Sequence, residues 1–93
     1  MTIGTLRVRA APATAASLKD KRRRLSSVKD RLRQRFNGAV AELEHLDEWR
    51  HTGLGVATLT SDGRVVSSVL RQVENLLRQM HGLTVLGVEK EIL

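Results

Sequence analysis

The sequence predicts an α+β fold with its elements in the order βαββαβ. Two segments, which Ser17 and Asp62 open, repeat apolar residues every three or four positions, as amphipathic helices do. Four other segments alternate apolar and polar residues or are rich in β-branched residues, which is typical of strands. With right-handed crossovers this order closes into a four-stranded antiparallel sheet with both helices on one face, the ferredoxin-like sandwich. We expect a single domain over residues 1–93, because a chain of 93 residues with 41% apolar content forms one core.

The first strand is predicted over residues 2–10, where Leu6, Val8 and Ala10 alternate with polar residues. The alanine-rich stretch 10–16 that follows is short and contains a proline, so we expect a loop and no cleaved export signal.

The first helix is predicted over residues 17–36. Ser17 can cap it, and Asp20 three residues later supplies the acidic partner of a capping box. Asn37-Gly38 supplies the residues that end a helix. The apolar stripe of this helix consists of Leu18, Leu25, Val28, Leu32 and Phe36.

Two strands of a hairpin are predicted over residues 39–46 and 51–60, separated by the polar turn at Asp47-Glu48. The second helix begins after Asp62 and stops at Gly82, and the last strand covers residues 83–93. The apolar stripe of the second helix consists of Val66, Val69, Leu70, Val73, Leu76, Leu77 and Met80.

The first helix is strongly basic. It carries nine Lys or Arg residues and two carboxylates, a net charge of +7 in a chain whose total is +6. Like charges four residues apart, such as Lys29 and Arg33, cost about 0.2 to 0.5 kcal/mol per pair. Unfavourable like-charge spacing that is repeated this often indicates a functional surface, and a row of basic residues is suited to bind a polyanion.

We therefore predict that this helix contacts the phosphates of RNA. Two rows of basic residues border the apolar stripe, and each extends about 16 Å at the helical rise. Two other interpretations stay open: a solvated face whose cations pair with Glu42, Glu44, Glu89 or Glu91, and a docking surface for an acidic protein. The candidate phosphate contacts are Lys19, Lys21, Arg22, Arg23, Arg24, Lys29, Arg31, Arg33 and Arg35.

Six short motifs stand out along the chain: Ile3-Gly4-Thr5-Leu6, Ser17-Leu18-Lys19-Asp20-Lys21-Arg22, Arg31-Leu32-Arg33-Gln34-Arg35-Phe36-Asn37, Ala41-Glu42, Asp47-Glu48-Trp49 and Val88-Glu89-Lys90-Glu91-Ile92-Leu93. Together they resemble the YlxP-like family of small bacterial proteins, and the resemblance covers essentially the whole chain. It implies a ferredoxin-like fold, a cytoplasmic bacterial protein and an unassigned biochemical role. Members are often encoded beside translation-initiation and ribosome-maturation genes, which implies a ribosomal or RNA partner. The resemblance offers no established catalytic residues.

The scarcity of aromatic residues limits how RNA could be read. Only Phe36 and Trp49 are aromatic, and Phe36 belongs to the helical stripe. Splayed bases usually stack on aromatic side chains, so we expect backbone contacts with weak sequence selectivity. Arg7 and Arg9 of the first strand could extend the basic surface, but we expect them to pair with the glutamates of the neighbouring last strand, Glu89 and Glu91.

The sequence gives no indication of an enzyme, a metal site or a cofactor. The segment 45–51 gathers His45, His51 and carboxylates, but its spacing matches no standard metal motif, and we expect a turn with Trp49 over an end of the core. Ser26 and Ser27 lie in mid-helix without a positioned base.

Acylphosphatases share the length and the βαββαβ order, but they bind phosphate in a loop after the first strand that contains glycine and arginine. The corresponding loop here, residues 11–16, has neither. We therefore expect no acylphosphatase-like activity and no small-molecule substrate.

The third strand has apolar residues on both faces and glycines at positions 53 and 55. Helices cover only one face of the sheet, so a second subunit could cover the other, and we weigh a homodimer for this reason. No apolar run reaches the about 20 residues of a membrane span, and the chain has no cysteine, so we expect a cytoplasmic protein without a membrane segment.

Overall fold

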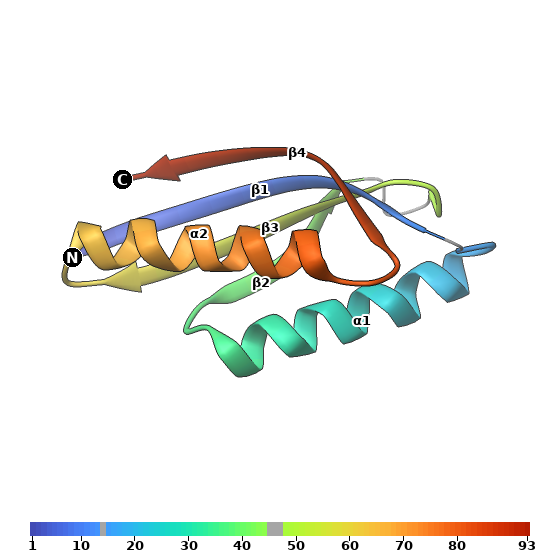
Figure 1. The fold of residues 1–93 in the computed structure, drawn as a ribbon, viewed down its shortest axis with the longest axis horizontal. Coiled ribbons are helices and arrows are strands. Elements are labelled where there is room, and N and C mark those ends of the chain that lie inside the picture. The colour runs from blue at the N-terminus through green and yellow to red at the C-terminus, as the bar shows by residue number, and fades with distance from the viewer. Residues whose placement is uncertain (14, 45–47) are drawn as a thin grey trace.

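The computed structural model describes residues 1–13, 15–44 and 48–93. The strands are β1 (Thr2–Pro12), β2 (Ala39–Glu44), β3 (Thr52–Thr60) and β4 (Leu83–Ile92), and the helices are α1 (Leu18–Arg35) and α2 (Gly63–Gln79). The strands form one antiparallel sheet in the order β2-β3-β1-β4. Figure 1 shows both helices on one side of this sheet, so the predicted ferredoxin-like fold is confirmed.

The two helices share the covered face of the sheet. Helix α2 packs on β1, β3 and β4, whereas α1 contacts β2. The register places Leu6 opposite Val56 and Val8 opposite Leu54, and all four side chains are buried under the helices. Alternate residues, such as Arg7, therefore lie on the open face of the sheet. The buried core consists of Leu6, Val8, Ala10, Leu25, Val28, Leu32, Val40, Leu54, Val56, Val66, Leu70, Val73, Leu77, Met80 and Leu83.

The caps of α1 and α2 follow the sequence closely. The Ser17 hydroxyl accepts a hydrogen bond from Asp20 N at 3.2 Å, and the Asp20 carboxylate accepts one from Ala16 N at 3.2 Å. Asp62 caps α2 by accepting a bond from Arg64 N at 2.9 Å. These bonds satisfy donors that the first helical turn leaves without an intrahelical partner.

Strand boundaries differ from the predictions by one or two residues. β1 continues to Pro12, and at residues 11–12 it pairs with β4 alone. That end of β1 is an edge, where the missing N–H of a proline does not break a ladder. Leu46, predicted to end the second strand, lies outside the described residues.

None of the helices within the described residues is long and apolar enough to cross a membrane.

Candidate nucleic-acid interface

Helix α1 turns one side into the core and leaves most of its basic residues outside. Leu25, Val28 and Leu32 are buried beneath it, as the stripe predicts, while Leu18 and Phe36 are half-buried. Arg24 and Lys29 are also half-buried. The exposed members of the predicted set are Lys19, Arg22, Arg23, Arg31, Arg33 and Arg35.

Lys21 does not belong to the exposed surface, so its assignment as a phosphate contact is wrong. Only 1% of its side chain is exposed, and its Nζ lies 2.8 Å from Glu42 Oε1. The same ammonium group donates a hydrogen bond to the carbonyl oxygen of Glu48. The Thr52 hydroxyl donates to Glu42 Oε1 at 3.3 Å, which helps to satisfy this carboxylate.

The position of Lys21 in the sequence carried a signal of its burial. It lies three residues after Leu18 and four before Leu25, which is the spacing of the apolar stripe itself. A lysine at such a position is buried only when a partner neutralises it. That partner, Glu42, lies on β2, and its proximity follows from the fold rather than from local sequence.

Two arginines of the predicted set are anchored to the rest of the fold. Arg33 Nη2 donates to the carbonyl oxygen of Val40 at 3.2 Å, and Arg33 Nη1 lies 4.0 Å from Asp30 Oδ1. The guanidinium of Arg24 lies so close to Gly82 that a Cβ atom there would clash with it. Arg33 thus faces β2, and Arg24 faces the turn between α2 and β4.

Of the carboxylates weighed as partners for α1, Glu42 forms an ion pair with this helix, and Glu89 lies on the other face of the sheet. Glu42 pairs with Lys21, and β4 places Glu89 opposite Arg7 on the open face of the sheet. Nothing is described of the Glu44 side chain. In the described part of the chain, no ion pair joins a carboxylate to Lys19, Arg22, Arg23, Lys29, Arg31 or Arg35.

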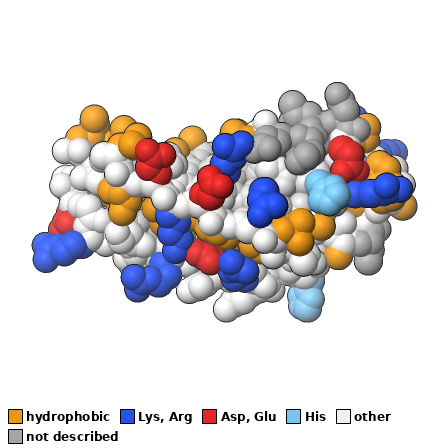
Figure 2. All heavy atoms as spheres, turned by 90° about the horizontal axis from the view of Figure 1, so that it is seen from above, with side chains coloured by type: hydrophobic (Ala, Val, Ile, Leu, Met, Phe, Trp, Pro, Cys, Tyr) orange, Lys and Arg blue, Asp and Glu red, His pale blue; other side chains and the backbone are white. Residues whose placement is uncertain are grey.

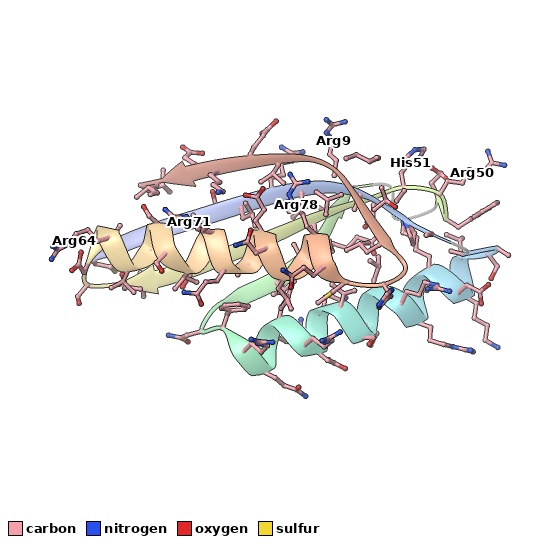
Figure 3. All side chains as sticks on the ribbon, viewed as in Figure 1. Arg9, Arg50, His51, Arg64, Arg71 and Arg78 are labelled. Atoms are coloured by element: carbon pink, nitrogen blue, oxygen red, sulfur yellow. The ribbon has the colours of Figure 1, made fainter. Side chains whose placement is uncertain are left out.

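Some cations outside α1 are paired with nearby carboxylates. Arg64, Arg71 and Arg78 follow one another along α2 (Figure 3). Arg64 pairs with Asp62 at 3.1 Å and Arg78 with Glu74 at 2.9 Å. On the side of β4, basic and acidic side chains lie interspersed (Figure 2). The residues outside α1 sum to a net charge of about −1, so the net positive charge of the chain lies on α1.

Hydrogen bonds lower the pKa values of three carboxyl groups that lie outside α1. Hydrogen bonds from Lys90 and then Arg78 lower the pKa of Glu74. The backbone N–H of Arg50 and the His51 side chain lower the pKa of Glu48. Hydrogen bonds from Arg64 lower the pKa of Asp62. Each of these carboxylates is held in its charged form by a neighbour on its own side of the molecule.

Among the described residues, the turn before β3 has no group of three or more histidine and carboxylate side chains that could hold a metal ion. His51 Nδ1 lies 2.7 Å from Glu48 Oε2, and the guanidinium of Arg50 stacks 4.8 Å from the centre of the half-buried Trp49 ring. His45, Leu46 and Asp47, which belong to the same predicted cluster, lie outside the described residues.

The arginines of β1 behave differently from each other. The register places Arg7 directly opposite Glu89, as the predicted pairing requires. Arg9 lies opposite Gly87, and its guanidinium covers that glycine, where a Cβ atom would meet it. Glu91 lies opposite Thr5, and within the described residues no ion pair joins Arg9 to Glu89 or Glu91, so the predicted pairing is not seen for Arg9.

The open face of the sheet holds a groove of about 580 Å³. Its floor is made of small residues, and the Leu43 side chain folds over Gly55, where a Cβ atom would meet it. Leu43 is 48% exposed and Leu59 of the same face is 50% exposed. The floor residues are Ala39, Ala41, Gly55 and Ala57.

The arrangement on α1 suits electrostatic contact with an anion. Guanidinium groups donate two parallel hydrogen bonds to a phosphate, and a helix displays them at fixed intervals. Within the described residues, no side-chain hydrogen bond joins a serine of α1 to a histidine, lysine or carboxylate.

Comparisons with known proteins agree with the resemblance seen in the sequence. A family model described as "Protein of unknown function (DUF503)" matches residues 3–90. The chain is 32% identical over 59 residues to "Uncharacterized protein YlxP" of Bacillus subtilis (strain 168). This match spans 63% of the chain and 64% of the relative, just under two thirds of its length. Because the family model covers nearly all of the sequence, the chain belongs to the DUF503 family, and its likeness to YlxP is confirmed.

Proposed function

We propose that this protein is a non-catalytic accessory protein that associates with RNA or the ribosome in the cytoplasm through α1. The observation that carries the proposal is the set of exposed cations on α1 that form no ion pair with the described carboxylates. These neighbouring cations repel one another until an external anion neutralises their charge. A phosphate backbone supplies such anions at regular intervals.

The shape of α1 supports contact with more than one phosphate. Arg24, Arg31 and Arg35 form one flank, and the other flank ends at Arg33. Each row extends about 16 Å, more than the distance between successive phosphates of one strand. The described open face carries no tyrosine or phenylalanine on which bases could stack, so we infer backbone binding with little preference for sequence.

Salt dependence tests the proposal. Binding of a fluorescein-labelled oligouridine should weaken steeply with added salt, with a log-log slope of about −0.7 for each phosphate contacted. An oligoadenosine of the same length should bind within a few-fold of it, since bases are not read. Binding that is insensitive to salt, or that is confined to one sequence, would contradict the proposal.

A second candidate function is a homodimeric interaction protein whose basic helix docks on an acidic protein. The groove on the open face, with exposed Leu43 and Leu59, supports the dimer. Isolation of the tagged protein from cells with and without ribonuclease separates the two candidates. An RNA-associated protein loses its partners after ribonuclease treatment, whereas a protein docked on an acidic partner keeps that partner.

A further inference from the structure

A small notch lies between α1 and the turn that joins α2 to β4. Its volume is about 160 Å³. One wall comes from α1 through Arg24, Ser27 and Arg31, and the other comes from His81 and Gly82. Residues 24 and 82 are far apart in the sequence, so only the fold brings these walls together.

The polar side chains that line the notch are all hydrogen-bond donors. Arg24, Ser27 and Arg31 are spaced i, i+3 and i+7, which places them on one flank of α1. His81 lines the opposite wall. None of the eight described residues that line the notch carries a carboxylate. Two guanidinium groups, a hydroxyl and an imidazole form a set of donors that suits an oxyanion.

The fold holds the Arg24 guanidinium at this position. Gly82 has a φ of +82°, and the Arg24 guanidinium occupies the space that a Cβ atom of this residue would take. The carbonyl oxygen of Gly82 accepts a hydrogen bond from Ala13 N at 2.8 Å. Because that bond occupies the carbonyl, less of its negative charge opposes an anion in the notch.

The floor of the notch is buried and apolar. Val28, Met80 and Leu83 form it, and each is only 8% exposed. The volume is below the about 300 Å³ of the smallest typical small-molecule pockets, so the notch admits a group rather than a whole nucleotide. It corresponds to about five waters of liquid volume.

We propose that this notch binds a single phosphate group of an RNA backbone, with Arg24 and Arg31 on its oxygens and Ser27 and His81 as further donors. The inference rests on the proposed function and deepens it, because it names one phosphate site within the wider basic surface. The notch fixes the position of the strand, and the remaining cations of α1 attract it over a longer range.

Nuclear magnetic resonance tests the site directly. Inorganic phosphate, titrated into the ¹⁵N-labelled protein, should shift the backbone amides of residues 27, 31 and 81–83 in a saturable way. Arg31→Gln should remove those shifts, and Ser27→Ala should reduce them, while both variants keep the dispersed spectrum of a folded chain. Arg71→Gln on α2 removes the same charge as Arg31→Gln and should leave the titration unchanged.

Binding of labelled oligouridine gives the second measurement. Arg31→Gln should weaken it by about tenfold, because a bond between charged groups is lost. Arg23→Gln, which removes the same charge on the outer side of α1, should weaken it by only about twofold. Equal losses for the two variants, with phosphate shifts spread evenly along α1, would overturn the notch while the proposed function stands.

Failure of the proposed function gives a different pattern. If oligouridine does not bind at low salt, α1 is not an RNA surface, and the phosphate titration alone then decides about the notch. Saturable shifts confined to residues 27, 31 and 81–83 would retain a phosphate site of another use. Absent shifts would remove it.

Discussion

Lys21 Nζ lies 2.8 Å from Glu42 Oε1, and this ion pair joins the first turn of the basic helix to strand β2. Within the described residues, Lys21 is thus the one member of the predicted set that is both buried and paired with a carboxylate. This lysine therefore belongs to the interior of the fold, whereas other cations of the same helix lie on its surface.

Lys21→Met should destabilise the fold. It leaves the partly buried Glu42 carboxylate without its cation, at a cost of about 3 kcal/mol in the free energy of unfolding. Urea denaturation measures this loss. The double variant Lys21→Met, Glu42→Leu should recover much of it, since no unpaired charge remains.

The matched control is Lys19→Met, which removes an exposed lysine of the same helix and should change the free energy of unfolding by less than about 0.5 kcal/mol. Equal effects at positions 19 and 21 would contradict the structural role of Lys21.

Gly82→Ala should destabilise the turn after α2. The residue has a φ of +82°, which costs an L-residue about 1 to 2 kcal/mol, and the added Cβ would also displace the Arg24 guanidinium. Thermal unfolding followed by circular dichroism should show a lower Tm. Gly63→Ala, at the start of α2, meets nothing closer than 3.7 Å and should instead raise the Tm. A Tm unchanged by Gly82→Ala would argue against this turn geometry.

Acid should weaken the contact between α2 and β4. Lys90 and Arg78 lower the pKa of Glu74 below its ordinary value of 4.5. A carboxyl group with a lowered pKa contributes stability that is present above its unfolded pKa and is lost as the pH falls through the folded pKa. Glu74→Gln should therefore reduce stability at neutral pH and bring the variant closer to the original protein below pH 4.5.

Urea titrations over this pH range measure the effect, and Glu91→Gln on the exposed end of β4 serves as the control. A constant difference between Glu74→Gln and the original protein at every pH would show that the ion pairs of Glu74 contribute nothing.

If the open face of the sheet joins two copies, Ala57→Arg should separate them. Ala57 lies on the floor of the groove, where a long charged side chain would be buried by a second subunit. Sedimentation velocity should show a dimer for the original protein and a monomer for the variant. Ser67→Arg on exposed α2 should stay dimeric. An original protein that is monomeric at high concentration would remove the dimer from consideration.

Local sequence patterns predicted the order of elements and both helix caps, because each depends on residues within a few positions of one another. Ser17, Asp20 and Asp62 form the caps that their spacing predicts. The same patterns also predicted which face of each helix is buried. Ends of strands were less predictable, since β1 reaches Pro12 only because β4 extends beside it.

The environment of each cation in the candidate site could not be predicted without the tertiary structure. Lys21 differs from its neighbours through Glu42, which is distant in sequence, and the spacing of the apolar stripe was its only local sign. The approach of Arg24 to Gly82 has no local sign at all. Composition could therefore identify the basic helix, whereas only the tertiary contacts could sort its cations into buried, anchored and exposed ones.

One comparison of charge-reversal variants tests the role of the exposed charge of α1 most directly. Arg31→Glu with Arg35→Glu on α1, and Arg64→Glu with Arg71→Glu on α2, each lower the net charge from +6 to +2. Affinity for a labelled oligouridine should fall by at least about tenfold for the α1 variant and much less for the α2 variant, with both folded by circular dichroism. Equal losses, or an α1 variant that binds as the original protein does, would show that α1 is not the site.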